Sequence, residues 1–228
     1  MLLQFSGRRT PADPILGHRS GHRSSKSLDC TRPLVYDLPI PIYSATDSAR
    51  SFRPDHCDGT YDQYCDETRQ YTNISAILSS YGRTSLLSYM ETYWKDQGGN
   101  DESFWEHEWG KHGTCVSTLN TKCYVNYKPQ QEVVDYFQKT IDLFKTLDSY
   151  KFLAIAGIVP STTKTYSSAQ VQKALGLFRG GVNASIECGG AGKNELQQIY
   201  YHFHVAGSAQ DGIYIPTQPG KSLFSPTR

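Results

Sequence analysis

Residues 104–115 read FWEHEWGKHGTC and hold two histidines, two glutamates, a lysine and a cysteine in twelve positions. If the stretch is helical, with about 100° between successive residues, Trp105 and Trp109 lie beside a crowded arc of roughly 140°. Because this arc brings imidazoles, a carboxylate and an ammonium group together beside aromatic rings, it is a candidate for acid–base chemistry on a phosphate. The arc consists of Phe104, His107, Glu108, Lys111, His112 and Cys115.

Two other interpretations compete with this one. A zincin site requires His-Glu-x-x-His, but here the second histidine comes one position later, which turns it about 140° from the first. This spacing argues against a catalytic metal. A solvated face with ion pairs is common in charge-rich helices, but two tryptophans and a phenylalanine argue against full exposure.

The chain has the size of one large domain. Its 228 residues are 38% hydrophobic and 12% aromatic, and the mean hydropathy of −0.53 fits a soluble globular protein. The longest apolar run, residues 152–159, is too short to span a bilayer, so we expect no membrane association. A net charge of +1 neither indicates nor excludes a polyanionic partner.

The cysteines and sequons favour an oxidising compartment. Six cysteines without any Cys-x-x-Cys pair argue against structural zinc and for disulfides. Sequons at Asn73 and Asn183 point the same way and predict a glycoprotein. The N-terminus contradicts this, because residues 1–20 contain no apolar stretch that could be a signal peptide.

Residues 1–50 differ in character from the rest of the chain. They hold seven Lys or Arg against four Asp, and the first part is rich in Arg and Ser without clear periodicity. We therefore expect 1–50 to be an atypical segment, disordered or foreign to the fold, and 51–228 to form the domain. A transit peptide is the alternative interpretation of the N-terminal stretch.

The remaining sequence predicts helices followed by strands, which is typical of an α+β domain. The clearest helix covers residues 130–147, where an apolar stripe recurs with helical spacing. The other predicted helices cover 72–95, 102–113, where Gly113 closes the helix, and 168–175. The predicted strands cover 182–187, 196–205 and 212–215.

The stretch 104–115 resembles the second active-site motif of the ribonuclease T2 family, acid-type endoribonucleases that are usually secreted. Residues 54–66, PDHCDGTYDQYCD, resemble the segment after the family's first active-site motif, and 156–175 and 194–217 resemble its later helix and strands. The chain is similar to fungal-type members over roughly 54–217. The resemblance implies a ribonuclease T2-like fold, with a central antiparallel sheet flanked by helices.

The resemblance implies cleavage of single-stranded RNA without a metal or cofactor. In this chemistry a base takes the ribose 2′-OH proton, the oxyanion attacks phosphorus, and an acid protonates the departing 5′-oxygen. The product is a 2′,3′-cyclic phosphate, which is then hydrolysed, and the 2′-OH requirement makes the activity specific for RNA. We therefore expect a monomeric endonuclease whose partner is its RNA substrate.

The resemblance also implies roles for individual residues. His112 is one member of the acid–base pair, while Glu108 and Lys111 stabilise the pentacovalent intermediate and His107 contacts phosphate. The bases are bound by Phe104 at the second position and by Asp55 and Tyr61 at the first.

The sequence departs from the family at its first motif, His-Gly-Leu-Trp-Pro-Asp. Here residues 50–55 read RSFRPD, so Arg50 stands where the other catalytic histidine is expected and Arg53 where a base-stacking tryptophan is expected. Arginine stays protonated and cannot act as the base, so we expect a loss of about 10²- to 10⁴-fold in rate. His56, six residues after Arg50, is a distant substitute. The alternative function is a catalytically inactive RNA-binding or interaction protein that retains the fold.

The resemblance implies that Cys65 pairs with Cys115. It also gives Cys57 and Cys123 partners near the N-terminus, where only Cys30 is present, and Cys188 has no partner near the C-terminus. We therefore expect at most four bonded cysteines. Together with the absent signal peptide and first motif, this pattern favours the hypothesis of a nuclease domain carrying a foreign N-terminal segment and a trimmed end.

Overall fold

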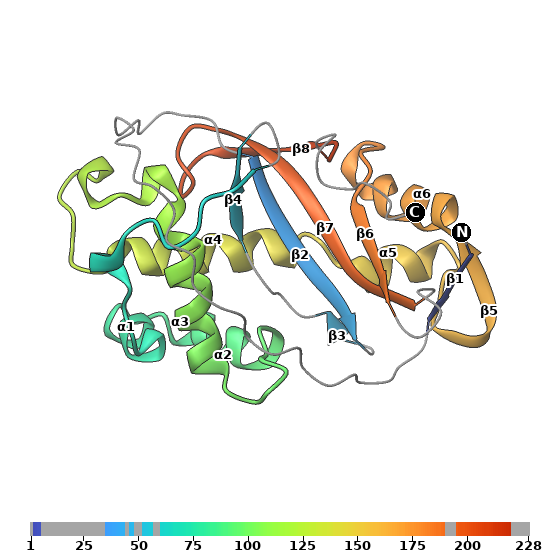
Figure 1. Ribbon diagram of the computed structural model, residues 1–228, viewed down its shortest axis with the longest axis horizontal. Helices are drawn as coiled ribbons and strands as arrows, with labels where there is room; N and C mark the ends of the chain where they lie inside the picture. Colours follow the sequence, from blue (N-terminus) through green and yellow to red (C-terminus); the bar gives the residue numbers. More distant parts are fainter. Residues whose placement is uncertain are drawn as a thin grey trace.

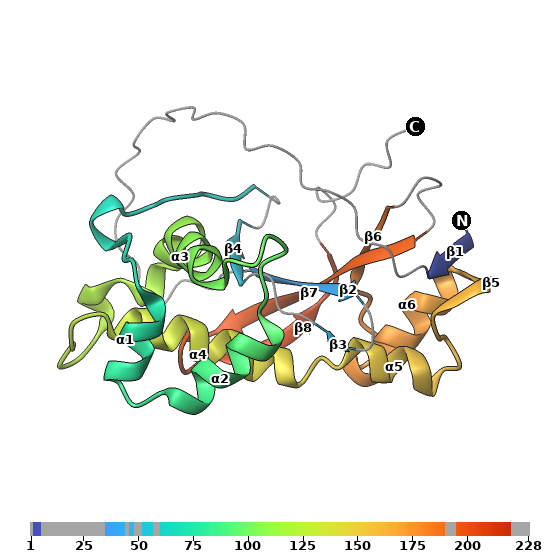
Figure 2. The same ribbon diagram turned by 90° about the horizontal axis from the view of Figure 1, so that it is seen from below.

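A central antiparallel sheet forms the middle of the fold (Figures 1 and 2). The computed structural model describes residues 2–5, 35–43, 46–47, 52–56, 60–189 and 195–219. The long strand β7 (Glu195–Ala206) pairs with β2 (Val35–Tyr43) on one side, in a register that places Ile40 opposite Ile199. This arrangement confirms the predicted α+β class and the central antiparallel sheet.

The other strands extend this pair. On its second side β7 pairs with β6 (Ser185–Gly189) and, further along, with β8 (Ile213–Thr217). The strand β2 pairs with β3 (Thr46–Asp47) and with β4 (Arg53–Asp55), which leads into the candidate site.

The long helix α4 (Gln131–Lys145) and the shorter α5 (Ser149–Ile155) lie along one face of the sheet (Figure 2). The predicted stripe of α4 is confirmed, because its apolar residues form part of the buried core. These residues are Val133, Val134, Phe137, Ile141 and Phe144, continued after the helix by Leu147.

Three helices gather at one end of the sheet (Figure 1): α1 (Ile74–Ser80), α2 (Thr84–Tyr93) and α3 (Asp101–Lys111). The single helix predicted over 72–95 is therefore wrong, since the chain breaks between α1 and α2. Gly82 has a φ of +67° there, in the left-handed region that glycine adopts without steric cost.

The opposite end holds α6 (Ser168–Gly176) and a two-stranded sheet of β1 (Leu2–Phe5) with β5 (Ser161–Ser167). The prediction of a helix over 168–175 is confirmed, and Ser167 and Gln170 form a reciprocal capping box at its start. The strand β5 and the helix α5 were not predicted from the sequence.

Three strands come from the segment that the sequence set apart, since β1, β2 and β3 all lie within residues 1–50. The composition of β2, VYDLPIPIY, is rich in β-branched and aromatic residues that favour strands, although it also holds two prolines. The expectation that residues 1–50 are an atypical segment, disordered or foreign to the fold, and the boundary between residues 50 and 51 both stay predictions.

Candidate active site

The helix α3 is anchored by its two tryptophans. Trp109 is fully buried and its indole Nε1 donates to the carbonyl of Arg69 at 2.6 Å. Trp105 is 2% exposed and donates in the same way to the carbonyl of Trp94 at 2.9 Å. Since both indoles point into the protein with their donors satisfied, the rotation of the helix about its axis is fixed.

The start of α3 is set by its own sequence. The side chain of Asn100 caps the helix by accepting from the amide of Ser103 at 3.2 Å. Asp101 and Glu102 occupy the first turn and Lys111 the last, which suits the helix dipole at both ends. The candidate residues therefore come at the C-terminal end of a well-defined helix.

The helix ends earlier than the sequence predicted. It stops at Lys111, and Gly113–Cys115 forms a separate 3₁₀ turn, so the helical arc does not extend to Cys115. His112 lies at the junction, where its amide still donates to the carbonyl of Glu108 at 3.1 Å. Glu108 and His112 therefore stay neighbours, as the helical arc predicted.

Residues 60–69 lie against this junction through several bonds. The disulfide between Cys65 and Cys115 confirms the pairing that the family resemblance implied. The amide of Cys65 donates to Thr114 Oγ1 at 3.1 Å, and the guanidinium of Arg69 donates to the carbonyl of Thr114 at 3.0 Å. This segment is thereby held beside the end of α3.

The strand β4 approaches the site from the sheet. The hydroxyl of Tyr136 on α4 reaches the carbonyl of Phe52 at 3.0 Å and that of Glu108 at 3.4 Å, so one group bridges the start of β4 and the third turn of α3. Arg53 follows Phe52 and is half-buried, and Asp55 is 5% exposed. The charge of Arg53 acts on His107, Lys111 and His112, which places Arg53 near the α3 cluster.

The electrostatics of the cluster centre on His112, which is 2% exposed. Burial, and then the positive charges of Arg53, Lys111 and His107, lower the pKa of His112 to about 2. Its imidazole is therefore neutral over the whole ordinary pH range. Among the described residues, Nε2 of His112 has no hydrogen-bond partner, so this atom can accept a proton from a bound group.

The pKa values of two neighbouring basic side chains, Lys111 and His107, are also lowered. Burial and the charge of Arg53 lower the pKa of Lys111, while Glu108 opposes this change. The pKa of His107 is lowered by burial, then by Lys111 and Arg53. His107 is an exposed residue overall. Even so, desolvation of its ring by the surrounding protein is the largest cause of its lowered pKa. The site thus combines a neutral imidazole, a buried carboxylate and concentrated positive charge.

Three of the predicted site residues lie together at the end of α3. Glu108, Lys111 and His112 meet at the end of α3, and the burial of Glu108 and His112 excludes a fully solvated face. Phe104 is half-buried against the core, and Tyr61 is 49% exposed.

Arg50 and His56 are the two residues considered for the first catalytic position. Arg50 lies outside the described residues. The ring of His56 is bound elsewhere, because its Nε2 contacts Asp62 at 3.1 Å.

The remaining cysteines extend the disulfide pattern. Cys123 is also disulfide-bonded, whereas Cys188 on β6 is a free thiol. Cys30 and Cys57 lie outside the described residues.

Tyr64 was missed by the sequence analysis. Its hydroxyl lies 3.3 Å from Nδ1 of His107, and its amide donates to the carbonyl of Lys111 at 3.0 Å. A usable signal was present, because Tyr64 precedes Cys65, and the expected bond to Cys115 places its neighbour at the end of α3.

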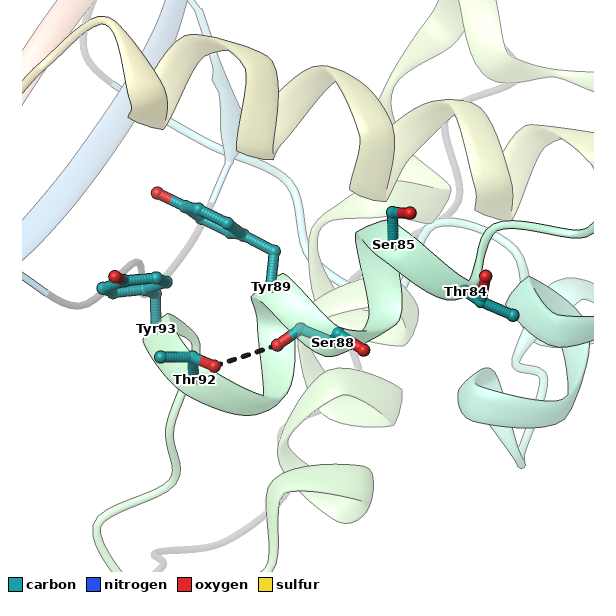
Figure 3. A pocket seen from close by; sticks show the side chains of 6 residues that line it. All are labelled: Thr84, Ser85, Ser88, Tyr89, Thr92 and Tyr93. Carbon is teal, nitrogen blue, oxygen red and sulfur yellow. Dashed lines mark hydrogen bonds between the residues drawn. The ribbon is translucent and has the colours of Figure 1, made fainter.

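A separate surface hollow lies on α2 and is shown in Figure 3. Thr92 Oγ1 donates there to the carbonyl of Ser88 at 3.0 Å. The lining offers hydroxyls and two tyrosine rings but no imidazole, carboxylate or amine, so the α3 cluster is the better candidate active site. The lining residues are Thr84, Ser85, Ser88, Tyr89, Thr92 and Tyr93.

Within the described ranges, no three His, Cys, Asp or Glu side chains gather closely enough to hold a metal ion. No helix in these ranges combines the length and apolar character needed to cross a bilayer.

The fold and the site define an α+β protein in which a buried histidine and a buried glutamate lie beside a half-buried lysine at the end of a helix. The model of the Ribonuclease T2 family matches residues 47–211. The chain belongs to the ribonuclease T2 family.

Similar proteins agree with this assignment. The chain is 52% identical to Ribonuclease T2 of Aspergillus oryzae over 173 residues, which cover 76% of this chain and 60% of that protein. It is 51% identical to Ribonuclease Trv of Hypocrea rufa, over 73% of this chain and 69% of the relative. The crystal structure of Actibind, a T2 ribonuclease, superposes with a TM-score of 0.78 at 42% identity, covering 86% of each chain.

Proposed function

We propose that this domain is an RNA endonuclease that cleaves single-stranded RNA by transphosphorylation through a 2′,3′-cyclic phosphate. The observation that carries the proposal is the burial of His112, as a neutral imidazole, beside Glu108 and Lys111. A neutral imidazole can take a proton from a ribose hydroxyl, and the negative charge of a bound phosphate raises the low pKa of His112 and so strengthens it as a base. The names of the similar proteins, all ribonucleases, support the same activity.

The proposed reaction uses the cluster as follows. His112 accepts the 2′-OH proton, and the 2′-oxygen forms a bond to phosphorus as the bond to the 5′-oxygen breaks. Lys111 neutralises charge on the pentacovalent phosphorus, and Glu108 assists this stabilisation. His107 contacts a phosphate oxygen. The leaving 5′-oxygen takes up a proton from water, because Arg50 stands where the second member of the acid–base pair is expected and does not release its proton.

The proposed substrate contacts are the residues to which the family resemblance gives base-binding roles. Asp55 and Tyr61 bind the first base, and Phe104 binds the second. The exposure of Tyr61 allows a base to stack on its ring. The half-buried ring of Phe104 leaves a smaller surface for this contact.

We propose that the activity is impaired because Arg50 replaces the second member of the pair. Arg53 adds to the impairment, since its charge opposes the protonated form of His112. The alternative is a catalytically inactive RNA-binding or interaction protein that retains the fold. The positive charge of Arg53 beside Lys111 and His107 favours this alternative, because such a site attracts a phosphate whether or not cleavage follows.

An RNA cleavage assay at acidic pH distinguishes these functions. The chain is compared with an Arg50→His/Arg53→Trp double variant, and His112→Ala is introduced into both. We expect slow cleavage by the unchanged chain, a rise of about 10²-fold or more in the double variant, and loss of cleavage with His112→Ala. The products carry 2′,3′-cyclic phosphate ends, which mass spectrometry detects.

The matched control is His204→Ala, which removes an exposed histidine on β7. It should leave the cleavage rate unchanged. Cleavage that survives His112→Ala would contradict the assignment of the site. RNA binding without cyclic phosphate ends, even in the double variant, would favour the inactive RNA-binding protein.

We further propose a secreted, monomeric glycoprotein. The sequon asparagines Asn73 and Asn183 are both exposed. Asn73 caps α1 through Oδ1, which accepts from the amide of Ala76, so the cap does not use the nitrogen that would carry a glycan. The bonded cysteines support an oxidising compartment. Expression in a eukaryotic host, followed by endoglycosidase treatment and mass measurement of medium and cells, tests the glycans and the secretion.

A further inference from the structure

Tyr64 contacts the candidate active site through its hydroxyl. The hydroxyl oxygen lies 3.3 Å from Nδ1 of His107, and the two rings meet edge to face, with centroids 6.2 Å apart and an angle of 79° between their planes. The other nitrogen of His107, Nε2, is not used by this contact. The hydroxyl of Tyr64 therefore contacts Nδ1 of the imidazole and leaves Nε2 available to bind another group.

The backbone of Tyr64 is held in an unusual conformation. Its φ is +51°, in the left-handed region that is sterically unfavourable for a non-glycine residue. Bonds to the end of α3 maintain it: the amide of Tyr64 donates to the carbonyl of Lys111, and the next residue, Cys65, is tied to Cys115. Such strain persists where the surroundings over-determine the conformation, and it is common at functional sites.

We propose that Tyr64 is a positioning residue that fixes the tautomer and the ring orientation of His107, so that Nε2–H of His107 donates to a phosphate oxygen of RNA. This inference rests on the proposed RNA-binding function. It assigns to Tyr64 an effect that acts through His107 and not through a contact with the reacting atoms.

The protonation states of both groups support this arrangement. Burial and the negative charge of Glu108 raise the pKa of Tyr64, so its hydroxyl keeps its proton and can donate. Burial, Lys111 and Arg53 lower the pKa of His107, which favours the neutral ring. When the hydroxyl donates to Nδ1, the single imidazole proton lies on Nε2.

A hydroxyl also tolerates a change of charge on His107. A phosphate near Nε2 favours the protonated imidazolium, in which Nδ1 carries a proton as well. The hydroxyl of Tyr64 can then rotate and accept from Nδ1–H. Phenylalanine keeps the ring contact but loses both interactions, so Tyr64→Phe isolates the hydroxyl.

The first measurement is the tautomer of His107 in the free protein, read from the imidazole ¹⁵N shifts. We expect the Nε2–H form to dominate in the unchanged chain and a mixture of both tautomers in Tyr64→Phe. The matched control is Tyr81→Phe, which removes a hydroxyl that donates to the carbonyl of Pro129 at 2.7 Å instead. An unchanged tautomer in Tyr64→Phe would overturn the proposal.

The second measurement is the affinity for a 2′-O-methyl dinucleotide, which binds without being cleaved. We expect Tyr64→Phe to weaken binding about two- to ten-fold, which corresponds to the loss of one hydrogen bond. In a His107→Ala background the same change should have no effect, because Tyr64 acts through the imidazole. An equal loss in both backgrounds would also overturn the proposal.

The two measurements separate this inference from the proposed function. The tautomer is measured without RNA and tests Tyr64 alone. Failure of the unchanged chain to bind the dinucleotide would count against the RNA-binding function. A dinucleotide that binds equally well to the unchanged chain and to Tyr64→Phe would count against the role of Tyr64.

Discussion

His112 is a candidate catalytic residue, and its burial lowers the stability of the folded protein in acid. Its ring is 2% exposed, and burial is the largest cause of a pKa lowered to about 2. In the unfolded chain the same imidazole titrates near its ordinary pKa of about 6.5. Between these two values the unfolded state binds a proton that the folded state does not, so acid favours unfolding.

This difference predicts a pH dependence of the free energy of unfolding. Above about pH 6.5 His112 is neutral in both states and contributes no pH dependence; as the pH falls below 6.5, stability decreases by up to about 1.4 kcal/mol per pH unit. His112→Asn should reduce this slope between pH 6 and 4, as measured by urea unfolding. The slope is the quantity to compare, because a loss of packing lowers the free energy of unfolding equally at every pH.

The matched control for this prediction is His204→Asn, on the exposed side of β7. It should leave the slope of the unchanged chain intact. A slope that is the same in His112→Asn and in the unchanged chain would show that His112 is not held neutral by the fold.

At the scale of the element, α3 depends on how its end is packed. Gly113 begins the 3₁₀ turn, and a Cβ atom at this position would overlap the indole ring of Trp109, with Cζ3 only 2.8 Å away. The ring is itself fixed, because Trp109 is fully buried and bonded to Arg69. The absence of a side chain at Gly113 therefore allows the chain to turn directly after His112.

Two glycine variants test this packing. Gly113→Ala should lower the free energy of unfolding by about 1–3 kcal/mol, since neither the indole nor the backbone can move freely. Gly110→Ala is the matched control, because the nearest atom there, Gln70 Cγ, is 3.7 Å away and alanine favours the helix by about 0.5–1 kcal/mol. Urea unfolding measures both. Equal effects of the two variants would contradict the proposed overlap with Trp109.

At the scale of the whole molecule, the disulfide between Cys65 and Cys115 joins the segment before α1 to the end of α3. The two cysteines are 50 residues apart in the sequence, so the bond restricts a large part of the unfolded chain. The loop that it closes contains α1, α2 and α3. The bond also holds Tyr64 next to the site, through its neighbour Cys65.

Removal of this bond should affect stability and the site together. The chain-entropy model gives a loss of about 4 kcal/mol for Cys65→Ser/Cys115→Ser. We also expect weaker binding of the 2′-O-methyl dinucleotide in the same variant, because Tyr64 loses a support. Cys188→Ser is the control, since it replaces a free thiol and should change stability by less than about 1 kcal/mol. Unchanged stability of the double variant would contradict the structural role of the bond.

The local patterns were predicted best where one physical cause determines the structure. The stripe of α4 fixes the buried side of a helix, because side chains three and four apart share a face. The start of α6 follows from the capping pair Ser167 and Gln170. The break at Gly82 was missed because a single glycine within a helical pattern does not show whether its φ is positive.

The sequence by itself determined the family and the presence of the motif FWEHEWGKHGTC, because the order of residue types is enough to recognise them. Helical spacing also placed Glu108 and His112 as neighbours. Only the tertiary structure decided that His112 is buried and neutral, since burial and the charge of Arg53 depend on chain segments distant in the sequence. The same reason explains Tyr64, whose contact with His107 joins residues 43 positions apart.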